Sequence, residues 1–105
     1  MNNNNTTTAR QLGEMLAIAG QYKLSRSALL SLCVLSEMHS ATLGQLTREL
    51  GLTSAAATGI ADSLAAMDFV VRSNGFSDRR QVWLDITPRG REALNDILTP
   101  QAVPA

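Results

Sequence analysis

The chain has 105 residues, of which 45% are hydrophobic and 4% aromatic, so it is long enough for one small aliphatic core and too short for two. Nine basic and nine acidic residues give a formal net charge of zero. This balance excludes a uniformly basic surface for nucleic acid, so any contact with phosphate must come from a local group of cations.

The N-terminal region is predicted to contain a disordered tail and a short helix. Residues 1–8 are rich in Asn and Thr and cannot bury apolar surface. From Leu12 to Ala19 apolar residues recur at helical spacing, and Gly20 offers a stop, which predicts an amphipathic helix over about 9–19. The start contains no secretory signal, and no apolar run approaches the ~20 residues of a membrane span. We therefore expect a cytoplasmic protein without membrane contact.

The second predicted helix supplies the centre of the core. Ser25 can cap it, and it continues through Met38 with an apolar stripe wide enough for full burial. Cys33 is the only cysteine of the chain and lies in this stripe, so it cannot form an internal disulfide. We expect an inert core thiol in a reducing compartment rather than a redox sensor.

Two short helices separated by a tight turn follow. Thr42 and Gln45 have the spacing of a capping box, which predicts a two-turn helix that ends at Gly51. Residues 51–54 are predicted to form a turn that closes with a hydroxyl cap, and residues 55–67 a second helix. These are the proportions of a helix-turn-helix.

Beyond the second short helix the hydrophobic period changes from about 3.6 to 2. Residues 69–72 and 82–86 are predicted strands that pair as a hairpin, and residues 73–80 combine Asn-Gly turn chemistry with two adjacent arginines. From residue 72 to 91 the chain carries five basic and two acidic side chains, a net charge of about +3. These basic residues are Arg72, Arg79, Arg80, Arg89 and Arg91.

A final helix closes the predicted domain. Thr87 can cap it, Pro88 suits its first position, and it continues to about Leu98. Residues 99–105 are predicted to be a flexible tail, so the folded domain covers residues 9–98. The expected fold is mainly α with a small β-hairpin, a winged helix-turn-helix.

From Ser25 to Leu98 the chain resembles the MarR family of regulators. The segment DRRQVWLDITPRG is similar to the family's wing, and ADSLAAMDFVVR is similar to the end of its recognition helix and its first wing strand. The residues that carry the resemblance in order and spacing are Asp62, Leu64, Phe69, Arg72, Asp78, Arg80, Ile86, Thr87 and Gly90.

The resemblance implies a transcriptional regulator that binds double-stranded DNA with its second short helix in the major groove. In the first half of that helix Ser54 and Thr58 can hydrogen-bond to phosphate or base, and Ala55 can contact a thymine methyl group. Gly59 occupies a position where the family often has a basic residue. Because the helix contains no arginine, we expect modest direct readout of bases.

A larger share of the specificity is expected from the wing, with Arg79 or Arg80 in a narrow minor groove. Arg72 is a further candidate DNA contact. The resemblance also implies that Asp78 braces the wing through a nearby arginine and that Asp62 orients Arg72 or Arg80. Solvated surface ion pairs are the alternative for both acids.

Two other residues depart from simple patterns. Asp68 occupies the family's glycine position after the recognition helix, and aspartate tolerates a positive φ better than most residues. The period of 2 assigns Trp83 to the face opposite the strand's other apolar residues. Ordinary packing against a neighbouring helix is favoured there, and the alternatives are cover by the N-terminal segment or a partner subunit, or stacking on nucleic acid.

The resemblance also bears on partners. The resemblance implies that family members are typically longer and dimerise through helices at both ends, and we expect this chain to lack most of the C-terminal part of that region. A homodimer is expected to rely on the first and last predicted helices. The family's small-molecule pocket commonly lies between the dimerisation helices and the DNA-binding domain, but the residues here imply no particular effector.

The alternative function is a winged-helix adaptor that binds protein and not DNA. Zero net charge and the arginine-free recognition helix favour the adaptor, and the wing arginines oppose it. The sequence has a single histidine, His39, and no phosphate-binding glycine loop. It therefore indicates no catalytic apparatus, metal cluster or cofactor site. We therefore expect a protein that is not an enzyme and that needs no cofactor.

Overall fold

The computed structural model describes residues 8–99 of the chain. In this part the helices are α1 (Ala9–Gln21), α2 (Arg26–Met38), α3 (Leu43–Leu50), α4 (Ser54–Ala66) and α5 (Pro88–Leu98), and the strands are β1 (Ser40–Thr42), β2 (Val70–Asn74) and β3 (Val82–Ile86). The predicted mainly helical winged helix-turn-helix fold is confirmed. The predictions of a disordered N-terminal tail and a flexible C-terminal tail concern residues 1–7 and 100–105, which lie outside the described residues.

Each helix begins after a hydroxyl residue whose side-chain oxygen accepts a backbone N–H from the first turn. The caps predicted at Ser25, Thr42 and Thr87 are confirmed. The cap of α4 is Thr53, so this helix starts one residue earlier than predicted and Ser54 is its first helical residue. The cap of α1 is Thr8, which forms a full capping box with Gln11 although the sequence suggested that the tail extends through this residue.

Several helices end at a residue in the left-handed region, where glycine is the usual choice. Gly51 ends α3 with φ 64°, as predicted, and Asp68 follows α4 with φ 64°. The prediction that α1 stops at Gly20 was wrong. The helix continues to Gln21, and Lys23 takes the left-handed conformation with φ 60° while Leu24 N–H donates to the carbonyl of Ala19.

The sheet has three antiparallel strands in the order β1-β3-β2. The predicted hairpin of β2 and β3 is present, with Val70 opposite Ile86 and Asn74 opposite Val82. The third strand, β1, was not predicted: the sequence suggested only a break after α2. A segment of three residues has too little pattern to be recognised, and it is a strand because Ala41 pairs with the buried Leu84 of β3.

The core lies where α2, α3, α4 and α5 meet the inner face of the sheet. Its largest fully buried apolar side chains are Leu32, Leu35, Leu46, Leu64, Leu84 and Ile97. The prediction that α2 is fully buried was wrong, because Leu30 and Met38 are 38% and 42% exposed and Cys33 is only partly buried. No element among the described residues covers that side of α2 completely.

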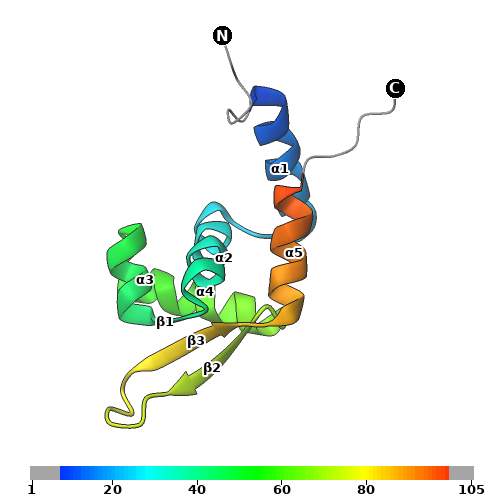
Figure 1. Ribbon diagram of the computed structural model, residues 1–105. Coiled ribbons are helices and arrows are strands. Elements are labelled where there is room, and N and C mark those ends of the chain that lie inside the picture. The colour runs from blue at the N-terminus through cyan, green and yellow to red at the C-terminus, as the bar shows by residue number, and fades with distance from the viewer. Residues whose placement is uncertain (1–7, 100–105) are drawn as a thin grey trace.

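Figure 1 shows α1 and α5 together as an arm that rises from the other helices, with the β2–β3 hairpin projecting from the opposite side. Tyr22, at the end of α1, ties the arm together, because its hydroxyl donates to the Asp96 carboxylate at 2.8 Å and its ring packs edge-on against Phe69. The apolar face of α1 is only partly covered, since Leu12 and Leu16 are 51% and 53% exposed. Within residues 8–99 no helix is long and apolar enough to cross a membrane.

Candidate nucleic-acid interface

The helix-turn-helix consists of α3, the three residues Gly51 to Thr53, and α4. The turn is tight because Gly51 adopts the left-handed conformation and Leu52 N–H donates to the carbonyl of Thr47. Thr53 then starts α4 by accepting the Ala56 N–H at 3.1 Å. The predicted helix-turn-helix proportions are therefore present, with the cap shifted by one residue.

One face of α4 is buried and the other is free. Ala57, Ala61 and Leu64 are at most 2% exposed and attach the helix to the core. The candidate contacts from this helix, namely Ser54, Ala55, Thr58 and Gly59, are all exposed. Residues three or four positions apart share one side of a helix, so the exposed face runs from the N-terminal turn of α4 toward Asp62.

The N-terminus of α4 also presents main-chain donors. The first helical bond of α4 runs from the Ala57 N–H to the Thr53 carbonyl, and the Thr53 hydroxyl takes the Ala56 N–H. The amides of Ser54 and Ala55 therefore precede the hydrogen-bonded part of the helix. Such amides, together with the positive end of the helix dipole, are suited to an anion.

Asp62 connects the exposed face of α4 to the wing. Its carboxylate forms an ion pair and a hydrogen bond with the guanidinium of Arg72 in β2. The two side chains are 60% and 47% exposed, so solvent screens the pair. Of the two partners suggested for Asp62, the structure has Arg72, and the pair makes α4 and β2 one continuous surface.

The wing loop between β2 and β3 is closed by a small network of hydrogen bonds. Gly75 N–H donates to the Gln81 carbonyl at 3.1 Å, Gln81 N–H donates to the Asp78 carbonyl at 3.1 Å, and the Asn74 side-chain amide donates to the Arg79 carbonyl at 2.7 Å. The suggested Asn-Gly turn was wrong, because Gly75 does not have a positive φ. The glycine is needed instead for close approach, since a Cβ there would lie 2.8 Å from the Asp78 carbonyl oxygen.

Asp78 is bound to Arg80 as the resemblance implied. Its Oδ1 accepts the Arg80 backbone N–H at 3.0 Å and lies 3.3 Å from the Arg80 Nε. The Arg80 side chain is nevertheless 93% exposed, and Arg79 is also exposed. The loop therefore holds two guanidinium groups outward at the end of the hairpin, where they can reach a phosphate or a groove.

The other arginines of the basic stretch have different surroundings. Arg91 turns toward α2, with its Nη2 2.7 Å from His39 Nδ1 and its Nη1 3.4 Å from the Ser36 carbonyl oxygen. Arg89 lies beside a cavity near the base of the arm. Arg72 is bound to Asp62, and the wing loop carries Arg79 and Arg80 against one acid, Asp78, so the net charge of the wing tip is +1.

Two wing residues were missed at the sequence level. The sequence indicates Asn74 only as part of a turn, whereas in the structure its side-chain amide donates to the Arg79 carbonyl. The sequence pattern assigns no role to Phe76, which is the most exposed large hydrophobic residue among residues 8–99. Its signal in the sequence is a lone aromatic residue inside the polar segment SNGFSDRR.

Trp83 lies on the sheet face opposite Leu84, as the period of 2 predicted, and is half-buried. It stands across from Thr42 on one side and Ser73 on the other. Together with Phe76 it lines a hollow of about 350 Å³ whose walls are formed by the strands and the wing loop. The side chain is therefore part of the wing and not of the helical core.

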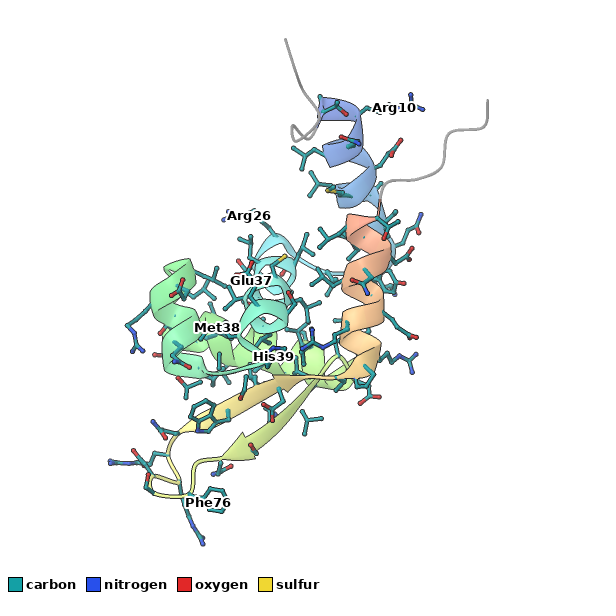
Figure 2. The ribbon with its side chains drawn as sticks, viewed as in Figure 1. Arg10, Arg26, Glu37, Met38, His39 and Phe76 are labelled. Atoms are coloured by element: carbon teal, nitrogen blue, oxygen red, sulfur yellow. The ribbon has the colours of Figure 1, made fainter. Side chains whose placement is uncertain are left out.

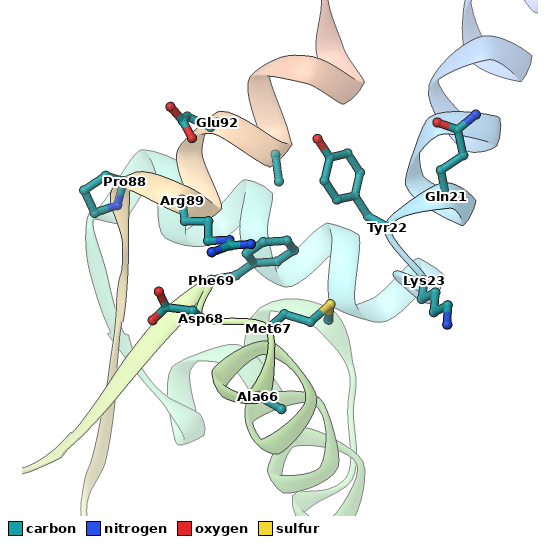
Figure 3. A pocket seen from close by; sticks show the side chains of 11 residues that line it. Gln21, Tyr22, Lys23, Ala66, Met67, Asp68, Phe69, Pro88, Arg89 and Glu92 are labelled. Carbon is teal, nitrogen blue, oxygen red and sulfur yellow. The ribbon is translucent and has the colours of Figure 1, made fainter.

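A larger cavity of about 850 Å³ lies between the end of α1, the end of α4 and the first turn of α5 (Figure 3). Tyr22 and Phe69 form its aromatic wall, Lys23 and Arg89 bring positive charge, and Glu92 brings negative charge. The hydrogen bond that the Tyr22 hydroxyl donates to the Asp96 carboxylate raises the pKa of this phenol. The mixed charges select no single class of ligand.

Among residues 8–99, Cys33 is not an activated thiol and no metal-binding cluster is present. Burial, and to a smaller extent the nearby Glu37 carboxylate, raises the pKa of the Cys33 thiol, which disfavours the reactive thiolate. Within the described part of the chain no group of three or more His, Cys, Asp or Glu side chains could hold a metal ion.

Comparison with known proteins finds the same architecture. A sequence profile of the MarR family matches residues 24–82. Over 65 residues the chain is 37% identical to the transcriptional repressor MprA of Escherichia coli, and this match covers 62% of the chain and 37% of the repressor. The chain therefore spans well under half the length of that relative.

Two solved structures share the fold. The YusO protein from Bacillus subtilis superposes with a TM-score of 0.77 and 22% identity, over 85% of this chain and 63% of YusO. A mutant of MarR from Escherichia coli, complexed with operator DNA, superposes with a TM-score of 0.71 and 18% identity, over 84% of this chain and 63% of MarR.

Proposed function

The chain belongs to the MarR family, and on that premise we propose that it is a transcriptional regulator that binds double-stranded DNA with sequence preference. The observation that carries the proposal is the continuous exposed surface from the N-terminus of α4, through the Asp62–Arg72 pair, to the wing arginines. A mutant of MarR that shares this fold is complexed with operator DNA, which supports DNA as the partner.

In this proposal α4 enters the major groove with its exposed face. Ser54 and Thr58 hydrogen-bond to phosphate or base, Ala55 approaches a thymine methyl group, and Gly59 allows the helix backbone to come close to the DNA. The free amides at the start of α4 face a phosphate. Because α4 has no arginine, its contribution to base discrimination is small.

The wing supplies the electrostatic part of the contact with DNA. Arg79 and Arg80 enter the adjacent minor groove, where a narrow A·T-rich segment has an enhanced negative potential. Asp78 holds the Arg80 side chain through its Nε, and Asp62 keeps Arg72 beside α4, where it can contact the backbone between the two grooves. Arg79 and Arg80 thus reach DNA at the tip, where Asp78 braces Arg80, and the Asp62–Arg72 pair lies at the base of the wing.

We further propose that the protein acts in the cytoplasm as a homodimer assembled through the arm. The exposed side chains Leu12, Leu16 and Leu98 on α1 and α5 give the arm an apolar surface that a second copy can cover. Two-fold symmetry would then present two α4 helices to a palindromic site. No effector is proposed, since the cavity beside the arm does not favour one ligand class.

The second candidate is an adaptor that binds protein through the same fold. The zero net charge and the arginine-free α4 favour it. The two candidates differ in how they bind a DNA duplex. The regulator binds it with an affinity that falls steeply as salt rises, because contact with DNA phosphates releases counterions. The adaptor binds no duplex.

The test is titration of the protein against a mixed-sequence duplex at several salt concentrations, comparing wild type, Arg80→Ala and Arg10→Ala. We expect log affinity to fall linearly with log salt, and Arg80→Ala to reduce the slope by roughly one unit for one lost phosphate contact. Arg10→Ala removes the same charge from α1, at the far end of the molecule from the wing (Figure 2), and should leave the slope unchanged. No binding at low salt would reject the regulator and favour the adaptor.

A further inference from the structure

The tip of the wing carries an aromatic ring that the arginine contacts do not use. Phe76 is 108% exposed, more than any other large hydrophobic residue among residues 8–99. Figure 2 shows its ring at the end of the hairpin, directed away from the sheet. Single exposed apolar residues are common on protein surfaces, so the surroundings of Phe76 must decide whether this one has a role.

The first feature of these surroundings is a braced loop. Phe76 lies between Gly75, whose N–H donates to the Gln81 carbonyl, and Asp78, whose carbonyl accepts the Gln81 N–H. The bond from Asn74 to the Arg79 carbonyl closes the same loop from its other side. The backbone is therefore held in place before any partner binds, which reduces the conformational entropy lost when Phe76 makes a contact.

The second feature is charge. Arg79 and Arg80 follow in the same loop, both exposed, and the carboxylate of Asp78 is already engaged by Arg80. The wing tip thus offers one apolar ring beside two guanidinium groups. Proteins that bind the minor groove combine these groups: arginines follow the negative potential of the groove, and an apolar side chain is pressed between two base pairs.

We propose that Phe76 is a minor-groove wedge. Its ring enters the groove beside Arg79 and Arg80, partly separates one base step and bends the duplex toward the major groove. This role rests on the regulator function proposed above. Because pyrimidine–purine steps such as TA unstack most easily, the wedge adds a sequence preference at a step that no hydrogen bond reads. It supplies specificity that the arginine-free α4 lacks.

The experiment uses a short duplex selected by the wild-type protein from a random pool, with 2-aminopurine at a TA step under the wing and a fluorophore pair on the two ends. Wild type, Phe76→Ala and Phe76→Leu are compared at several salt concentrations. Met38→Ala is the matched control, since it truncates another exposed apolar side chain on α2, away from the wing. Affinity, end-to-end energy transfer and 2-aminopurine emission are measured.

We expect Phe76→Ala to bind roughly tenfold more weakly, as for loss of one ring stacked on a base. Its salt slope should equal that of wild type because no charge is lost. The change in energy transfer and the rise in 2-aminopurine emission should disappear in Phe76→Ala, and Phe76→Leu should retain most of both. Met38→Ala should behave as wild type.

Three outcomes overturn the wedge. If Phe76→Ala binds and bends the duplex like wild type, Phe76 has no role in the groove, and the regulator proposal stands. If wild type binds no duplex in a salt-dependent way, both proposals fall. If Phe76→Ala lowers thermal stability or shifts the emission of Trp83 before DNA is added, Phe76 supports the hollow that both aromatic residues line and is not a wedge.

Discussion

Replacing Gly90 by alanine should destabilise the protein, because a buried backbone contact leaves no room for a Cβ. Gly90 lies in the first turn of α5, and a Cβ there would lie 2.3 Å from the Phe69 carbonyl oxygen and 3.0 Å from Ile86 Cγ1. Real Cβ contacts essentially never fall below 3.0 Å, so α5 and the start of β2 must separate by at least about 0.7 Å. The Phe69 oxygen cannot move freely, since it also accepts the Thr87 N–H at 3.0 Å.

The size of the effect follows from two opposing contributions. Overpacking of a closely packed site costs about 3 kcal/mol at the upper end of its usual range. Alanine is favoured over glycine inside a helix by about 1 kcal/mol. We therefore expect Gly90→Ala to lower the free energy of unfolding by about 2 kcal/mol, and the midpoint of thermal unfolding by roughly 8–16 °C.

The assay is urea unfolding followed by far-ultraviolet circular dichroism and by the fluorescence of Trp83. Gly13→Ala is the control, because Gly13 lies exposed in α1 and a Cβ added there would meet no atom within 4 Å. This control should stabilise the protein by up to about 1 kcal/mol. A Gly90→Ala variant as stable as wild type would contradict the expectation, since it would mean that the wing and α5 can shift apart without loss of packing.

The remaining predictions concern an ion pair and a thiol. If Asp62 acts on DNA binding only by holding Arg72, then Arg72→Ala and the double variant Asp62→Ala/Arg72→Ala should bind a duplex with equal affinity, measured by fluorescence anisotropy. Burial and the Glu37 carboxylate raise the pKa of Cys33, so at a given pH iodoacetamide should alkylate the folded protein more slowly than the urea-unfolded chain, and Glu37→Gln should accelerate the folded reaction slightly.

Both predictions have clear contrary results. Independent, additive losses from the two single variants would show that Asp62 and Arg72 act separately on DNA. Equal alkylation rates in the folded and unfolded states would show that Cys33 is neither desolvated nor shielded. The sign of the thiol effect is set by its raised pKa: the folded state disfavours the thiolate, so the associated stability is present at low pH and lost as the pH rises through the folded pKa.

The local elements of this fold were predictable because their signals are local. A hydroxyl residue followed by apolar residues at helical spacing predicted the starts of α2, α3 and α5, and Gly51 predicted the end of α3. The alternation from Val82 to Ile86 identified β3 and the outward side of Trp83. These features depend on chemistry within a few residues, where capping and periodicity operate.

Features that depend on distant partners were not predictable in the same way. The strand β1 exists because Ala41 meets Leu84, more than forty residues along the chain. Gly20 did not stop α1, because Lys23 could take the left-handed turn instead. The exposed side of α2 could not be foreseen either, since the apolar pattern alone does not say which neighbours will cover it.

The winged helix, the helix-turn-helix and the cluster of arginines in the wing can all be recognised in the sequence, because caps, periods and charge are properties of short segments. The surroundings of those arginines, in contrast, depend on the tertiary structure. The fold pairs Arg72 with Asp62, turns Arg91 toward His39, and leaves Arg79 and Arg80 outward with Phe76 at the wing tip. A side chain's charge is fixed by its residue type, but its freedom to meet a partner depends on which groups the fold brings beside it.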